Sequence, residues 1–473
     1  MQSMPVCYLI GALAVLVGAT AIVKRPIVGL YLLTACAVLV EAQPLEISVL
    51  TDRLHVYSWP PELAGRAERP IGLCLLFVLV VVGYRRWRDG RRPLDGGPLL
   101  WPFAVFLLFV AWGCVRGWLA GGVPKIIVLE ARPFCYLFFA YLLAFNVIDT
   151  PRQVRALLWI IIVGVGVKAL QGLYVYLVVL HGHLEGHRDI MAHEDSFFLA
   201  TVIVLFAVFA FHHRDPRQYS AILLLLPFLA VAMIANQRRV AYLALLAGTV
   251  VAWTLAFLLS PPRRRQLLTI LSIGLPLIVF YVLAFFPDTT FLARPAHGIV
   301  SVFYPDPAED FTAKSNLYRA MENDGLLTTI RQDPWLGRGF GRPFLPPVAL
   351  PDLSQWNAYY LYIPHNGIYW VWMRLGLIGF LALWLLLGSL IVRGALIAER
   401  LHDQAQRTVA IFVVAVTIME ILVAYADYQL YVLRNVLYLG VLAGAQMKLP
   451  TLGEDRSAGR AGYHRAVTAG VRA

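Results

Sequence analysis

Residues 364–387 read PHNGIYWVWMRLGLIGFLALWLLL, and this stretch decides the fold. A polar Pro-His-Asn start leads directly into an apolar run long enough for a membrane-spanning helix. Before it lies a long mixed-charge segment, residues 287–362, punctuated by Pro and Gly. Polar loops on a rigid scaffold are where function concentrates. We therefore predict an active site in this loop and at the neighbouring helix ends.

The composition indicates a membrane protein. Of the 473 residues, 59% are hydrophobic and only 14% are charged, whereas soluble domains carry about 25% charged residues. Apolar runs of roughly 18 residues or more recur along the chain, as spanning helices require. We predict an all-α, polytopic transmembrane helix bundle of about 12–13 spans, with one large extracytoplasmic loop that contains short helices.

The predicted spans alternate correctly with their connectors. They are residues 5–23, 26–40, 71–84, 99–115, 126–146, 156–180, 195–211, 218–235, 240–259, 267–286, 363–391, 408–424 and 435–447. Lys and Arg cluster in alternate short connectors, as the positive-inside rule requires. This pattern accounts for the net charge of +12 without a nucleic-acid partner. It also places the N-terminus outside, with no cleavable signal peptide, because Lys24 and Arg25 follow the first apolar run.

The chain divides into four parts by this pattern. Residues 1–286 would hold the first ten spans, 287–362 the large outer loop, 363–447 the last three spans, and 448–473 a disordered cytoplasmic tail.

Cysteines and histidines give no metal or disulfide motif. The five cysteines lie in or beside apolar runs and are expected to be small packing residues: Cys7, Cys36, Cys74, Cys114 and Cys135. One outer loop is rich in histidine, with His181, His183, His187 and His193 next to Glu194 and Asp195. A metal site there is the alternative, but the spacing fits no compact ligand motif, so we predict no metal and no cofactor.

Two elements are predicted inside the large loop. Ser315–Arg331 is expected to form a helix on or near the outer membrane surface, stopped by Asp333-Pro334. Its apolar side would consist of Leu317, Ala320 and Met321, and its polar side of Arg319 and Glu322. The segment Trp335–Gly341 then carries three glycines, which permit positive φ and close backbone approach. No strand precedes it, which excludes a dinucleotide site.

His365 and the arginine pair Arg238–Arg239 are the first candidates for chemistry. An imidazole at the outer end of a span can accept a proton from a sugar hydroxyl, although an interfacial histidine is the alternative. The arginines lie in a very short outer turn, where the positive-inside bias disfavours them. They are either interfacial anchors or bidentate ligands for the phosphates of a lipid diphosphate.

Lys168 and Asp427 are less decisive. Lys168 lies mid-span and must face the bundle interior. It would either pair structurally with Glu130 or Glu420, which is the favoured interpretation, or face a polar cavity. Asp427, at the outer end of the twelfth span, would be an interfacial acid or would orient a catalytic base.

Four motifs in order resemble the bacterial O-antigen ligase / O-antigen polymerase superfamily. They are Asn236-Gln-Arg-Arg239 entering an apolar helix, Ser315-Asn-Leu-Tyr-Arg319, Pro334-Trp-Leu-Gly337-Arg-Gly339-Phe-Gly341, and Pro364-His365-Asn366 followed by Leu375-Gly376-Leu-Ile-Gly379. The clear resemblance covers residues 196–390. The family has Ser where this chain has Arg238, which leaves open whether Arg238 or Arg239 faces the substrate.

The resemblance implies a metal-independent glycosyltransferase of the bacterial inner membrane, with its large loop in the periplasm. Its donor would be a polyprenyl-diphosphate-linked glycan. His365 would be the base for the acceptor hydroxyl, and Arg239 and Arg319 would bind the diphosphate. Further substrate contacts are predicted at Arg238, Lys168, Asn366, Arg338 and Asp427.

Three functions remain open at this point. We favour a polymerase that joins repeat units of an O-antigen or exopolysaccharide. Its alternative with the same chemistry is a ligase that moves the finished glycan to lipid A-core or protein. A transporter of a small anion or a lipid-linked glycan is the alternative of another class. Aromatic side chains of the loop would stack on sugars: Trp335, Phe340, Trp356, Tyr359, Tyr360 and Tyr362. Other polysaccharide-assembly membrane proteins are the expected protein partners.

Overall fold

The computed structural model describes residues 15–41, 51, 54, 56–57, 69–184, 190–212, 215–286, 290–303, 310–354 and 358–470. Regular structure in these ranges is helical throughout, which confirms the all-α prediction. Cys7, His187 and Trp356 lie outside the described residues. The other four cysteines are half-buried and form no disulfide.

The helices follow the predicted spans closely. A short apolar helix, Val15–Lys24, precedes the labelled elements. These are α2 (Ile27–Leu39), α3 (Pro70–Arg88), α4 (Leu100–Leu119), α5 (Pro124–Val147), α6 (Pro151–Tyr174), α7 (His193–Phe211), α8 (Pro216–Ala235), α9 (Arg239–Leu259), α10 (Arg264–Phe285), α11 (Arg294–Phe303), α12 (Asp310–Gln332), α13 (Gly367–Arg400), α14 (Gln404–Ala426) and α15 (Leu433–Gly470). In the described part of the chain, ten helices are long and apolar enough to cross a membrane.

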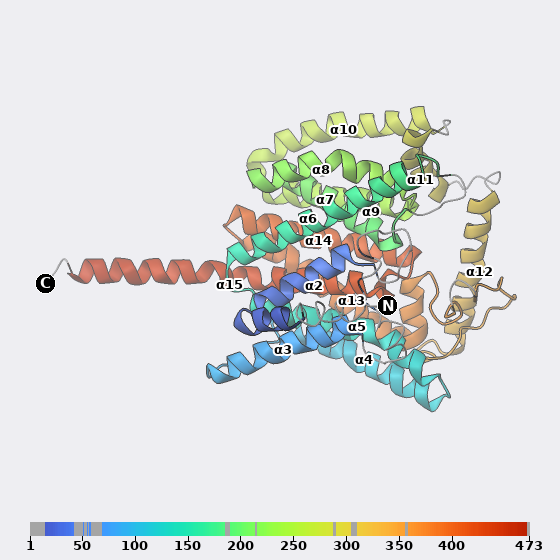
Figure 1. The fold of residues 1–473 in the computed structure, drawn as a ribbon, viewed down its shortest axis with the longest axis horizontal. Coiled ribbons are helices and arrows are strands. Elements are labelled where there is room, and N and C mark those ends of the chain that lie inside the picture. Colours follow the sequence, from blue (N-terminus) through green and yellow to red (C-terminus); the bar gives the residue numbers. More distant parts are fainter. Residues whose placement is uncertain are drawn as a thin grey trace, which may run out of the picture.

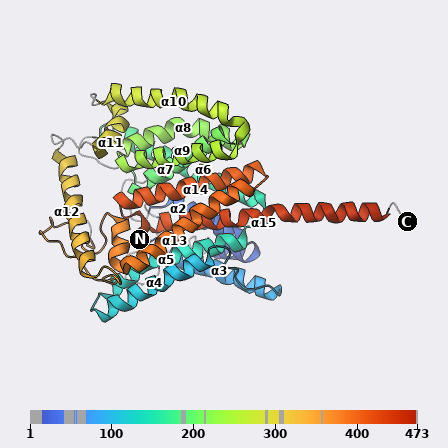
Figure 2. The same ribbon diagram turned by 180° about the vertical axis from the view of Figure 1, so that it is seen from behind.

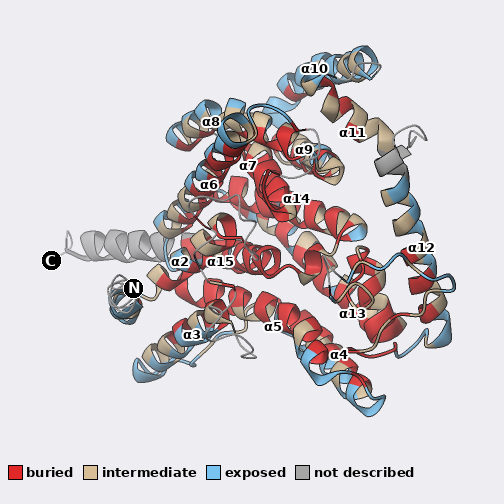
Figure 3. Ribbon diagram, turned by 45° about the vertical axis from the view of Figure 1, so that its right-hand side comes forward, coloured by how far each residue is buried: buried red, intermediate tan, exposed pale blue. Residues whose placement is uncertain are grey.

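The long helices lie side by side in one bundle (Figure 1). Its centre is formed by α5, α7, α14 and the first half of α15, which are largely buried (Figure 3). Gly440 and Gly444 of α15 lie against the carbonyl oxygens of Leu137 and Tyr141 in α5. Small residues permit such close helix approach in membranes. At the edge, α10 exposes Phe280 and Leu283, as a helix facing lipid does.

Two helices of the large loop cover one end of this bundle. α12 runs across the end of the spanning helices, nearly at right angles to them (Figures 1 and 2). The predicted helix is confirmed, but its predicted sides are wrong. Leu317 is 61% exposed, whereas Glu322 is buried together with Leu326 and Ile330. The face of α12 that packs on the bundle therefore includes a carboxylate, because that carboxylate has a polar partner there.

The predicted glycine turn is confirmed in both of its properties. Gly337, Gly339 and Gly341 have φ of 72°, 81° and 77°. A Cβ on Gly337 would overlap the backbone of α13 at Gly376, and one on Gly339 would overlap the backbone of Gly117. Gly376 itself has φ 69° and kinks α13. Only glycine allows these backbone conformations at such close range.

The C-terminal part of the chain continues the last helix of the bundle. α15 continues through Pro450 to Gly470 and projects from the bundle (Figure 1). Its first half is buried against α5, so the costly nucleation step is already complete. The Ala and Arg residues that follow are good helix formers and can extend it.

Candidate active site

His365 stands immediately before α13 and is held by a buried carboxylate of α12. Its Nδ1 lies 3.1 Å from Oε2 of Glu322, and its backbone N–H donates to the same oxygen at 2.9 Å. The Glu322 side chain is 2% exposed, while that of His365 is 30% exposed. The imidazole is thus fixed on one side and open on the other.

This geometry suits a general base. With the proton on Nδ1 donated to Glu322, Nε2 keeps a free lone pair for a substrate proton. A carboxylate that orients the base and stabilises its protonated form is the arrangement of hydrolytic triads. Tyr318 and Tyr428 flank the ring edge to face, with centroids 5.8 and 6.1 Å away. The sequence analysis missed Glu322 as a site residue; its spacing of three from Arg319 was the available signal.

The two arginines at the start of α9 face different neighbours. Arg239 donates to Ser301 Oγ of α11 at 3.3 Å and to Asn316 Oδ1 of α12 at 3.1 Å. Arg238 lies close enough to Tyr428 for its charge to oppose the burial that raises the pKa of that phenol. Arg239 therefore faces the loop helices, whereas the charge of Arg238 acts on Tyr428, which flanks His365.

Asn236 fixes the turn that carries this arginine pair. It is fully buried, accepts hydrogen bonds from the backbone of Ile190 and Met191, and donates to Ser196 Oγ at 2.8 Å. The turn is thereby locked to the start of α7, on the same end of the bundle.

Asp427, which ends α14, completes the group. Its Oδ2 lies 3.5 Å from Nδ1 of His193 and accepts from the Gln429 amide at 2.9 Å. Burial alone would raise the pKa of Asp427, but the hydrogen bond and charge of His193, with the nearby charges of His365 and Arg319, hold that pKa below its ordinary value. His365, Arg319, Arg238 and Asp427 are thus brought together, although Glu322 and not Asp427 orients His365.

Comparison with known families finds one match. Residues 220–385 match the family model described as O-antigen ligase. We call these residues the O-antigen ligase segment. It runs from α8 into α13 and contains Arg238, Arg239, Arg319 and His365, so the resemblance found in the sequence is confirmed. The family indicates an enzyme of the ligase or polymerase type. A search of curated proteins finds no match.

Lys168 lies outside the O-antigen ligase segment, and its predicted partners are wrong. It is 1% exposed and binds Glu41, with Asp195 Oδ2 at 3.5 Å and Gln171 Oε1 at 3.4 Å. Asp195 also pairs with the buried Arg434 at 2.6 Å. Lys168 therefore forms a structural ion pair, the interpretation that we favoured. Its carboxylates come from the end of α2 and the start of α7. This arrangement depends on helix packing and not on sequence spacing.

The predicted partners of Lys168 are engaged elsewhere. Glu130 binds Arg374, with Nε at 2.7 Å, and also accepts from Trp370 and from the backbone of Gly341. Glu420 accepts from Asn435 at 3.1 Å. Among the described residues, no three His, Cys, Asp or Glu side chains are grouped as metal ligands.

Arg374 organises the O-antigen ligase loop and was missed in the sequence. It is fully buried and donates to the carbonyls of Gly339, Arg342 and Tyr362 at 3.1, 2.5 and 2.7 Å. It thus joins the glycine turn to the segment that ends in His365. A charged side chain inside an apolar run is costly unless it has a polar partner. Arg374 in the run after His365 was therefore the signal in the sequence.

The remaining predicted contacts lie around the same loop. Asn366 caps α13 through Oδ1 and Tyr369 N–H at 2.9 Å. Arg338 is 8% exposed and its Nε has no partner in the described part of the chain. Burial lowers the pKa of Arg338, and the charges of Arg342 and Arg374 lower it further. The charge of Asp333 opposes this shift. Phe340 is buried against Phe134 and Trp370, so its predicted role in sugar stacking is wrong.

Proposed function

We propose that this protein is a metal-independent glycosyltransferase that polymerises repeat units of a surface polysaccharide at the outer face of a bacterial inner membrane. Its donor is a glycan carried on polyprenyl diphosphate. The observation that supports this most is the His365–Glu322 pair, because it presents an oriented base beside arginines contributed by α9 and α12.

The base acts on the acceptor. His365 Nε2 takes the proton of a sugar hydroxyl as the hydroxyl oxygen attacks the anomeric carbon of the donor. The bond from that carbon to the diphosphate oxygen breaks, and its electron pair leaves with the diphosphate. Glu322 stabilises the imidazolium that forms, since its carboxylate lies against Nδ1.

The arginines act on the leaving group. Arg239 and Arg319 bind the diphosphate and stabilise the charge that develops on it, as preorganised donors do outside bulk water. Arg238, whose charge acts on Tyr428, is a further ligand. Guanidinium groups match phosphate oxygens in a bidentate fork, so this chemistry requires no metal.

A ligase that delivers the finished glycan to lipid A-core or protein would use the same chemistry with another acceptor. The family match supports the ligase or polymerase type generally. The acceptor is therefore the property that an experiment must resolve.

The test is the size distribution of polyprenyl-linked glycans in cells whose only copy carries His365→Ala. We expect transfer to fall by roughly 10²–10⁴-fold, the contribution of a positioned base. Accumulated single repeat units support the polymerase, and accumulated long chains on the lipid identify a ligase instead. His402→Ala is the matched control, because His402 is exposed at the far end of α13. An unchanged lipid pool with normal surface glycan and normal protein level would refute the enzyme and favour transport.

A further inference from the structure

Arg294 is an arginine that neither the sequence motifs nor the proposed reaction include. It begins α11 directly after the short helix η4 (Phe291–Ala293), and its guanidinium lies over the Phe291 ring at 5.6 Å. Arg294 is half-buried and forms no hydrogen bond or ion pair with any described residue. Of its guanidinium nitrogens only Nη1 is buried. Nε and Nη2 are therefore the nitrogens that a ligand can reach.

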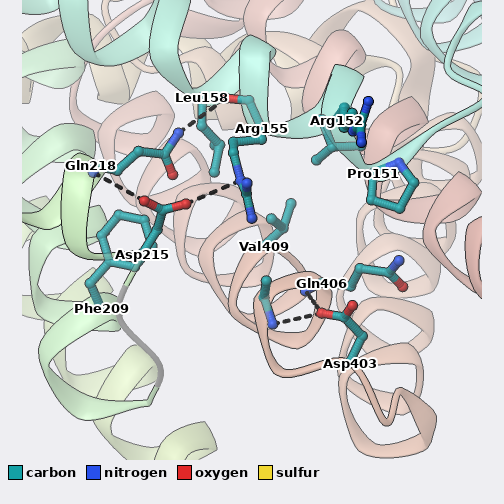
Figure 4. A pocket seen from close by; sticks show the side chains of 12 residues that line it. Pro151, Arg152, Arg155, Leu158, Phe209, Asp215, Gln218, Asp403, Gln406 and Val409 are labelled. Atoms are coloured by element: carbon teal, nitrogen blue, oxygen red, sulfur yellow. Dashed lines mark hydrogen bonds and ion pairs between the residues drawn. The ribbon is translucent and has the colours of Figure 1, made fainter.

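Arg155 shows the more usual arrangement of an arginine near a helix start. It pairs with Asp215 at 3.1 Å, and Asp215 also caps α8 (Figure 4). Arg155 lies near the start of α6, whereas Tyr176 follows the end of α6 and stacks on Phe291 at 5.4 Å. Arg294 is thus at the outer end of the bundle, where the positive-inside rule disfavours arginine. An outer arginine that forms no ion pair with a described residue favours an anionic ligand.

The face of α11 that carries Arg294 packs against the start of α9. Gly298 and Ser301 follow Arg294 by four and seven residues and therefore lie on the same face. A Cβ on Gly298 would lie 2.9 Å from the ring of Tyr242 and 3.6 Å from Cγ of Arg239. Ser301 Oγ accepts a hydrogen bond from Arg239, and the charge of Arg294 acts on Tyr242. Arg294 is therefore about one helical turn, about 6 Å along α11, from the contact with Arg239.

Arg294 and His365 lie on opposite sides of Arg239. α11 lies between α10 and α12 (Figure 3). Near its start, Tyr281 of α10 donates to the carbonyl of Leu292, two residues before Arg294. Toward its other end, Arg239 bridges α11 to α12, the helix that holds His365. Because α10 is the helix that faces lipid, Arg294 is on the lipid side of this row.

The order of groups in the donor matches this order of residues. In the proposed reaction the anomeric carbon lies at His365, and the sugar-side phosphate, the prenyl-side phosphate and the prenyl chain follow. We propose that Arg294 binds the prenyl-side phosphate, while Arg239 and Arg319 bind the sugar-side phosphate. The Nε and Nη2 donors of Arg294 form a fork that matches two phosphate oxygens. This inference rests on the proposed glycosyltransferase function.

The position of Arg294 predicts which kinetic constant it controls. Transfer breaks the bond between the sugar carbon and the oxygen of the sugar-side phosphate, so new charge develops on that phosphate. The charge of the prenyl-side phosphate is the same before and during the reaction. Arg294 therefore stabilises the bound donor and the transition state equally, which lowers the KM for the donor and leaves kcat unchanged.

The test measures binding of polyprenyl diphosphate, with phosphatidylglycerol as the comparison lipid, to the full-length protein in nanodiscs. We expect Arg294→Gln to weaken polyprenyl diphosphate binding by roughly 10- to 100-fold, the contribution of hydrogen bonds to a charged group. Phosphatidylglycerol binding stays the same. In glycan transfer, the same variant raises the KM for the donor by a similar factor with little change in kcat.

Two further variants serve as controls. Arg294→Lys retains part of the binding, because the charge remains while the fork is lost. Arg264→Gln leaves binding unchanged. Arg264 also lies over an aromatic ring, that of Phe257 at 5.3 Å, but it stands at the start of α10, the inner end of that helix.

Four results would overturn the inference. Unchanged polyprenyl diphosphate binding by Arg294→Gln, while Arg239→Gln weakens it, would remove Arg294 from the donor site and leave the proposed function intact. Equal weakening of phosphatidylglycerol binding would make Arg294 a general lipid anchor. A lower kcat at unchanged KM would assign it to the sugar-side phosphate. Failure of the unaltered protein to bind polyprenyl diphosphate would refute the donor of the proposed function as well. Thermal unfolding of each variant in the same nanodiscs separates loss of binding from loss of the fold.

Discussion

Two arginines of the O-antigen ligase segment, Arg374 and Arg239, lie in opposite surroundings. Arg374 has no exposed surface, and its donors are taken by one carboxylate and three backbone carbonyls. Arg239 is half-buried at a helix start and donates to the neutral oxygens of Ser301 and Asn316. The first arrangement leaves nothing for a substrate to bind. The second holds a guanidinium at a half-buried helix start through side-chain oxygens of α11 and α12, where a substrate can approach it.

The largest expected effect comes from removing the buried Arg374. Arg374→Ala leaves Glu130 buried without its cation, so we expect the free energy of unfolding to fall by about 3–5 kcal/mol. Thermal unfolding of the purified protein in detergent measures this. Arg88→Ala is the control, because its pair with Asp89 at 3.8 Å is more than half exposed on both sides and should cost less than about 1 kcal/mol. Equal losses in the two variants would contradict the structural role of Arg374.

A smaller effect is expected at Glu322, the carboxylate that orients His365. Glu322→Gln keeps the shape beside His365 but removes the charge that stabilises its imidazolium, so glycan transfer should fall on the order of 10- to 100-fold. Glu322→Asp, which keeps the charge on a shorter side chain, should retain more of the rate than Glu322→Gln. Glu399→Gln, at an exposed position, is the matched control. A normal rate in a Glu322→Gln variant that folds normally would contradict the role of this carboxylate.

The smallest effect is expected at Asp427. Its pKa is held below its unfolded value of about 3.9, so its ionised form stabilises the fold above that pH, and this contribution is lost as pH falls through the lower folded value. Asp427→Asn should therefore lower the unfolding temperature at pH 7. The difference from the unaltered protein should shrink below about pH 4. A difference that is constant from pH 7 to pH 3 would assign the loss to packing and not to charge.

The contrast between the arginines also explains what the sequence could predict. Motifs are local, so Arg239, Arg319 and His365 were identified, and the positive-φ turn followed from its glycines. Partners are not local. Glu322 pairs with His365 across 43 residues and Glu130 with Arg374 across 244, and these pairs depend on which helix faces pack. Lys168 was given the wrong partners for the same reason.

The kink at Gly376 lies close to the outer edge of the apolar layer. Residues 377–392, up to the first charged residue after the kink, extend about 24 Å as a helix, which is somewhat less than the roughly 30 Å of the apolar core. The residues just before Gly376 therefore also lie in the apolar layer, and the rest of Gly367–Leu375 separates that layer from His365. In the proposed reaction, a hydrophilic acceptor would meet the base at headgroup depth while the prenyl chain of the donor stays in the membrane.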